Sequence, residues 1–160
     1  MAKIARKYMA HYIDASFGGS SASWYRLGED LEEYNVELNP DTEQRKNILG
    51  QNNFQHNGYE VTGDSSPFYA RSGDALFEKL QNIVDTLATD DTLKTSSIEV
   101  HLWETPTSSA YPAYKQDCYV VPQSYGGDTS GYQIPFTVYY VGAKVAGTFN
   151  PSTDTWAATV

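Results

Sequence analysis

Histidine and cysteine side chains come first, because imidazoles and thiolates ligate metals and act as bases or nucleophiles. His11, His56 and His101 are scattered along the 160 residues, without a second histidine or cysteine at the spacing of a metal site. Cys118 is the only cysteine, so an intramolecular disulfide is excluded, and its strand-like flanks predict a buried, inert thiol. His101 falls in the polar phase of a strand, which favours a solvent or interface histidine. We therefore expect no metal and no cofactor.

Short catalytic motifs do not alter that expectation. The sequence contains no Gly-x-Ser-x-Gly elbow and no phosphate-binding loop. The pairs Gly18-Gly19 and Gly126-Gly127 do not stand between a strand and a helix, as a dinucleotide site requires, so they indicate turns. The sequence favours a protein that is not an enzyme.

Charge is the next constraint. The net charge of −9 argues against tight binding of nucleic acid, which needs clustered lysine and arginine. Seven acids lie within residues 29–43, and residues 27–44 contain no lysine or arginine. Such a run indicates either a solvated face or, if many copies surround a common space, a field that repels polyanions. The basic residues Lys3, Arg6 and Lys7 are either a solvated terminus or a tail that pairs with an acidic neighbouring subunit.

The hydrophobic pattern predicts a mainly β fold with one helix. Apolar residues alternate with polar ones at 34–38 and 98–103, which is the signature of half-buried strands. One apolar stripe has helical spacing and predicts a helix at about 74–88, capped by Asp74 or Ser72; it consists of Leu76, Leu80, Ile83, Val84 and Leu87. The expected strands are 24–27, 34–38, 59–62, 98–103, 114–124, 132–141, 143–149 and 155–160.

This order of elements predicts a single domain over residues 1–160. It is an antiparallel β-sandwich or barrel-like sheet with the helix packed on one side. Two segments lack a burial pattern. Residues 1–23 suggest a weakly patterned N-terminal arm followed by a small, polar connector at 15–23. Residues 39–59 begin with an Asn-Pro-Asp turn, and a stretch of that length is uncommon unless it has a function or is disordered.

Three segments of the sequence resemble a known family. They are LEEYNVELNPDTEQRKNILG (31–50), NGYEVTGDSSPFYARSGDALFEKLQNIV (57–84) and VVPQSYGGDTSGYQIPFTVYYVGAKVAGTF (120–149). In this order and spacing they are similar to the major tail tube proteins of siphophages that infect Gram-positive bacteria. The resemblance covers most of the chain, from about residue 24 to residue 149.

The resemblance implies two antiparallel sheets with a flanking helix, an architecture shared by contractile-phage tube subunits and the type VI secretion tube protein. It also implies hexameric rings that stack into a tube. A long hairpin reaches the adjacent ring in such proteins, and residues 39–59 match it. The inter-ring candidates are Asn39, Pro40, Arg45, Lys46, Ile48, Leu49 and Phe54. The candidate acids for the channel wall are Glu29, Glu32, Glu33, Glu37, Glu99 and Asp117.

The expected function is therefore a structural subunit whose acidic channel conducts DNA during ejection without binding it. Its expected partners are further copies of itself and the tape measure, terminator and baseplate or tip proteins. We expect it in the virion tail, made in the host cytoplasm, and in no membrane. A tailocin or other injection-system tube fits equally. The alternative is a monomeric β-sandwich module that stacks sugars on Trp24, Trp103, Trp156 or its 13 tyrosines, and a small enzyme ranks third.

Overall fold

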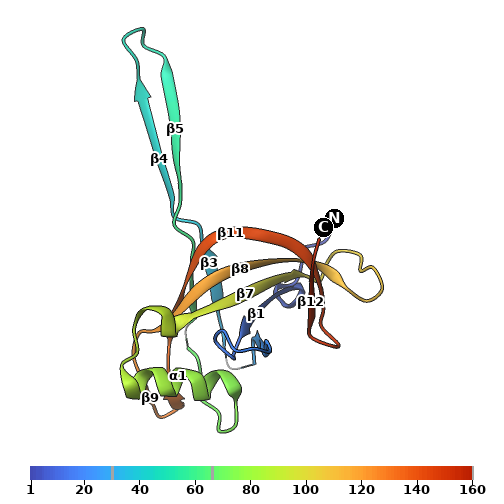
Figure 1. Cartoon of the computed structure of the whole chain (residues 1–160). Helices are drawn as coiled ribbons and strands as arrows, with labels where there is room; N and C mark the ends of the chain where they lie inside the picture. Colours follow the sequence, from blue (N-terminus) through green and yellow to red (C-terminus); the bar gives the residue numbers. More distant parts are fainter. Residues whose placement is uncertain (30, 66, 160) are drawn as a thin grey trace.

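The described residues form one large antiparallel sheet, two small β-ribbons and one α-helix (Figure 1). The computed structural model describes residues 1–29, 31–65 and 67–159. It confirms the predicted class, a mainly β fold with one helix beside a curled antiparallel sheet. In the described part of the chain, no helix is long and apolar enough to cross a membrane.

The large sheet runs in the order β2-β1-β7-β8-β11-β6-β3, and β12 pairs with the far half of β11. Its strands are β1 (Met9–Asp14), β2 (Trp24–Leu27), β3 (Tyr34–Glu37), β6 (Thr62–Ser65), β7 (Lys94–His101), β8 (Tyr111–Pro122), β11 (Phe136–Asn150) and β12 (Thr155–Ala158). The ribbons are β4 (Pro40–Lys46) with β5 (Asn52–Tyr59) and β9 (Gly126–Asp128) with β10 (Gly131–Gln133). The helix is α1 (Ala75–Thr86), and two 3₁₀ turns are η1 (Arg6–Tyr8) and η2 (Asp90–Leu93).

The sheet curls until its two ends meet. Tyr34 on edge strand β3 shares a hydrogen bond of 2.6 Å with the hydroxyl of Tyr140 on β11. Its ring centroid lies 4.9 Å from that of His11 on β1, near the other end of the strand order. A Cβ at Gly63 on β6 would lie 2.3 Å from the Tyr34 hydroxyl, so only glycine lets this ring cross the concave face. The resemblance implied two sheets, whereas the described strands outside the two ribbons make one curled, barrel-like sheet.

The helix covers part of the concave face. Asp74 caps it by accepting a hydrogen bond from the backbone N–H of Leu76 at 3.0 Å. Leu76 and Leu80 are completely buried in the main core cluster, which also contains Cys118. The predictions of the helix and of a buried cysteine are therefore confirmed, and burial raises the pKa of the Cys118 thiol to about 12.

The prediction that Leu87 belongs to the apolar stripe of the helix is wrong. Leu87 lies past the last helical residue, takes a left-handed backbone conformation (φ 51°), and is 80% exposed. A residue in the left-handed conformation turns the chain out of the helical path. The side chain of Leu87 therefore leaves the stripe that its spacing predicted.

A second core cluster lies on the face of the sheet opposite to the main core. It is formed by Ala10, Tyr12, Ile98, Val100, Ala113 and Phe149. Trp24 and Trp156 are partly buried against it. Strand β1 thus contributes to both clusters, since Ile13 belongs to the main core and Tyr12 to the second.

The predicted N-terminal arm is wrong over residues 9–14. These residues form β1, which pairs with both β2 and β7 and is buried along nearly its whole length. Several strand boundaries also differ, and the expected strand 98–103 is β7, which ends at His101. The expected strand 59–62 begins at Thr62 as β6, and the expected strands 132–141 and 143–149 are largely one strand, β11, with a register shift between Val141 and Val145.

Candidate assembly surfaces

The β4–β5 hairpin projects away from the curled sheet, and α1 and β9 lie at the opposite end of the molecule (Figure 1). Its strands pair in antiparallel register from Pro40–Tyr59 to Lys46–Asn52. Every side chain of β4 is exposed, and on β5 only Gly58 is partly covered. Residues 39–59, which lack a burial pattern in the sequence, therefore form a regular β-hairpin that packs little against the rest of its own subunit.

The two faces of this hairpin differ in chemistry. One face carries Phe54, His56 and Tyr59, whose rings contact one another in sequence, with centroids 6.4 Å and 4.5 Å apart. The other face is polar, and Arg45 there bonds Glu43 at 3.2 Å. Exposed aromatic residues are typical of surfaces that become buried on association.

The tip of the hairpin is ordered by one asparagine. The side-chain oxygen of Asn47 accepts hydrogen bonds from the backbone N–H groups of Leu49 and Gln51 at 2.9 and 3.0 Å. Gly50 completes the turn with φ of 79°, a conformation that glycine adopts without strain. The turn leaves Ile48 fully exposed and Leu49 75% exposed. Two aliphatic side chains are thus displayed by a preformed loop.

The base of the hairpin is attached firmly to the sheet. Asn39, in a left-handed conformation, donates side-chain hydrogen bonds to the backbone oxygen of Glu60 and the hydroxyl of Thr62. The structure thus brings all seven inter-ring candidates together on one hairpin, with Asn39 at the base and Ile48 and Leu49 at the tip. The sequence analysis missed His56, Tyr59 and Asn47. The Asn-x-x-Gly pattern of the tip was the available signal for Asn47.

The six candidate channel acids are not brought together. Glu29, Glu32 and Glu33 lie in the connection between β2 and β3, and Asp30 of the same run lies outside the described residues. Strand register places Asp117 and Glu99 on opposite faces of the sheet, with Glu99 on the face of the main core. Glu37 shares the face of Asp117 through its partner Thr62. One subunit surface cannot present all six to a channel.

Glu99 is also neutralised within the subunit. Its carboxylate contacts His101 at 3.0 Å and Lys144 at 3.6 Å. Burial alone would raise the pKa of Glu99, but the His101 hydrogen bond and the Lys144 charge outweigh it, so the pKa is lowered. His101 stacks on Trp103 and also bonds Glu104, so the structure contradicts the solvent alternative, while an interface histidine stays a prediction.

His11 predicts a loss of stability in mild acid. Burial lowers its pKa from 6.5 to about 4, although the nearby Glu99 acts in the opposite direction. Between these two values the unfolded chain binds a proton that the folded chain does not. The free energy of unfolding should therefore be highest above pH 6.5 and fall by about 2 kcal/mol between pH 8 and pH 5.

Urea unfolding midpoints measured from pH 8 to pH 5 check this expectation. The control is His11→Gln, which removes the titrating group. The variant should be less stable at pH 8, yet it should lose most of the pH dependence in this range. An equal slope in both proteins would show that His11 is not the source.

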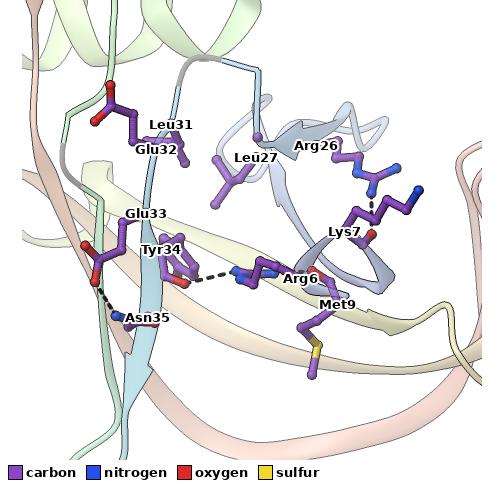
Figure 2. Close-up of a pocket in the computed structure, with 11 residues that line it drawn as sticks. Arg6, Lys7, Met9, Arg26, Leu27, Leu31, Glu32, Glu33, Tyr34 and Asn35 are labelled. Carbon is purple, nitrogen blue, oxygen red and sulfur yellow. Dashed lines mark hydrogen bonds between the residues drawn. The ribbon is translucent and has the colours of Figure 1, made fainter. Parts of the chain in front are cut away.

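A pocket of about 420 Å³ lies where the two ends of the sheet approach each other (Figure 2). Arg6, Lys7 and Arg26 line it together with the acids Glu32 and Glu33. Arg6 donates to the backbone oxygen of Tyr34 at 2.9 Å, and Arg26 donates to that of Lys7 at 3.0 Å. Arg6 therefore links the N-terminal segment to edge strand β3, whereas Arg26 joins β2 to the segment that precedes β1. Arg6 is thus held against its own subunit rather than in a freely solvated terminus, and pairing of the basic residues with a neighbouring subunit stays a prediction.

The tryptophans do not form a common platform. Trp24 packs edge-on against Phe149, with ring centroids 6.4 Å apart, and Trp156 is partly buried in the same cluster. Trp103 is exposed, but His101 covers one of its faces with ring centroids 4.5 Å apart. A sugar platform would need unobstructed aromatic faces on one surface.

The strand order leaves β2 and β3 at the two ends of the large sheet, and β12 pairs with β11 alone, so all three are edge strands. Edge strands offer backbone groups to another chain and are a hazard in a monomer unless they are covered. On β3, Arg6 already occupies the carbonyl of Tyr34.

No protein-family model matches this chain, and no curated protein matches it.

Proposed function

We propose that this chain is a structural subunit of a phage-type tail tube, which assembles into hexameric rings that stack around a channel for DNA. The observation that carries the proposal is the β4–β5 hairpin. It is paired backbone outside the core, with an aromatic face and a bare aliphatic tip. The resemblance of three sequence segments to tail tube proteins supports the same reading.

The physical reason is that an isolated hairpin is only marginally stable in water. Exposed apolar side chains at its tip give it no stability within the subunit, so they indicate a partner. A contact between unlike surfaces of identical chains is heterologous, and it continues from copy to copy. Rings stacked in this way form a tube. The other proposed partners are the tape measure, terminator and tip proteins, with DNA passing unbound.

The acidic composition is compatible with a channel for DNA, because clustered cations would retain phosphates. Glu99 no longer belongs among the channel acids, since it is paired with Lys144 and His101. The sugar-binding alternative loses support because Trp24 and Trp156 pack against the second core cluster.

Assembly as a function of concentration tests the proposal. We expect the purified protein to be largely monomeric when dilute and to form rings or tubes when concentrated, because many weak contacts must form before a ring closes. Sedimentation velocity and negative-stain electron microscopy measure both states. A monomer at every concentration, with no rings or tubes on the grids, would contradict the proposal.

A further inference from the structure

We infer that the apolar pocket at the end of α1 receives the hairpin tip, Ile48 and Leu49, of another copy of this chain. The pocket has a volume of about 300 Å³. Its apolar lining, which we call the α1-end pocket, includes Ile83, Val84, Leu87, Leu93, Val121 and Tyr125. The inference rests on the proposed function and names the surface to which the hairpin binds.

The first argument is the position of Leu87. A leucine at φ 51° adopts a conformation that glycine and asparagine tolerate better. Its side chain gains no burial in return, because it is 80% exposed at the pocket. Tyr125, across the same pocket, is 66% exposed. Two large apolar groups therefore face solvent at one concave site.

The second argument is the match to the tip. A volume of about 300 Å³ is at the lower limit of small-molecule pockets, so it suits one or two aliphatic side chains and excludes a helix. Ile48 and Leu49 are such a pair, and Asn47 fixes their turn before binding. A preformed loop loses less conformational entropy on docking.

The third argument is charge. Lys46 lies two residues before Ile48, at the end of β4. Asp90 and Asp91 line a shallow pocket that shares Leu93 with the α1-end pocket, and Asp85 lies in the last turn of α1. A cation on the hairpin thus meets acids at the rim, an arrangement that favours this orientation over others.

The fourth argument is placement. The hairpin and α1 are at opposite ends of the molecule (Figure 1). A contact between them is therefore heterologous, and repeating it adds copies along one direction. A hairpin that docked on a copy of itself would close a dimer and stop.

Leu87→Gly is the most informative variant. Glycine suits the left-handed position, so the melting temperature should stay the same or rise. The protein concentration required for assembly, measured by sedimentation, should nevertheless rise at least tenfold. The matched control, Thr86→Ala, changes an exposed neighbour outside the pocket and should assemble like the unmodified protein.

Cross-linking locates the contact directly. Cys118 is buried, so thiols introduced at the surface react without background. Leu49→Cys chains are mixed with Tyr125→Cys chains and mildly oxidised, and the rate at which the mixed disulfide dimer forms is measured. This rate should be at least fivefold higher than in a mixture with Glu32→Cys, whose thiol lies in the pocket lined by Arg6.

A charge swap tests the rim. Lys46→Glu should weaken assembly, and adding Asp91→Lys should restore it.

Each result decides between the two proposals. Normal assembly by Leu87→Gly, or faster cross-linking to Glu32→Cys, would overturn the α1-end pocket and leave the tube function standing. If the unmodified protein never assembles but Leu49→Cys still cross-links selectively to Tyr125→Cys, the pocket would be supported and the tube overturned. Absence of both assembly and selective cross-linking would overturn both.

Discussion

Replacing residues 42–56 by a short Gly/Ser linker is expected to abolish tube formation completely while leaving the body of the protein folded. The side chains of β4 are all exposed, as are those of β5 except at Gly58, so removal of the hairpin uncovers no core residue. The melting temperature should therefore change little, whereas the aromatic face and the tip are lost together. Circular dichroism reports the fold, and negative-stain microscopy reports the tubes.

The matched control keeps the hairpin and changes only its polar face. Glu43→Gln with Gln55→Asn changes two exposed, paired residues of the polar face, and the ion pair that Glu43 loses contributes little stability. This double variant should still assemble. Tubes formed by the linker variant would show that the rings associate through another surface.

Hydrogen exchange adds an independent readout of the same segment. A two-stranded hairpin that packs on nothing is marginally stable, so the amides of β4 and β5 should exchange rapidly in the dilute subunit. Docking on a second copy should protect them. Equal protection in the dilute and assembled states would mean that the subunit alone stabilises the hairpin.

The elements that sequence predicted well are those with one buried face. The stripe from Leu76 to Ile83 marks the side of α1 that packs on the sheet, and Ile98 and Val100 mark one face of β7. In such elements the pattern of apolar residues directly reflects burial. Hydrophobic periodicity was therefore sufficient to predict the fold class.

Strand β1 was missed because it is buried on both faces. Tyr12 and Ile13 point to different core clusters, so no alternation is visible. Two of its residues are polar, yet buried. Asp14 accepts hydrogen bonds from the backbone and hydroxyl of Ser16 and from the backbone of Ser23, and His11 lies against Tyr34. Polar partners supplied by the fold cannot be read from local sequence.

Sequence patterns could not predict the structure of the hairpin or the positions of the candidate channel acids. Strands β4 and β5 bury nothing, so pattern could only report that residues 39–59 lack a core, and the resemblance supplied the hairpin. For Glu99 and Asp117 the strand register decides which face each acid occupies. That register depends on pairing between segments distant in sequence, which composition does not encode.

Leu80→Ala should impair folding and affect assembly only through it. Leu80 is completely buried in the main core cluster, among residues of β8 and β11 such as Val120 and Val138. Truncating a buried leucine costs about 2–5 kcal/mol, because apolar contact is lost and a cavity remains. This is a large share of the stability of a domain of this size. Thermal and urea unfolding measure the loss.

Leu87→Ala is the control, because the sequence pattern places Leu87 in the same stripe as Leu80 whereas the structure leaves it exposed. Both leucines belong to one stripe by spacing, but Leu87 is 80% exposed beyond the last residue of α1. Its truncation should change the free energy of unfolding by less than about 0.5 kcal/mol, as surface substitutions usually do. Equal losses in the two variants would place Leu87 against the core and extend the helix through it. A large loss at Leu80 alone would establish that the stripe ends where the backbone turns left-handed.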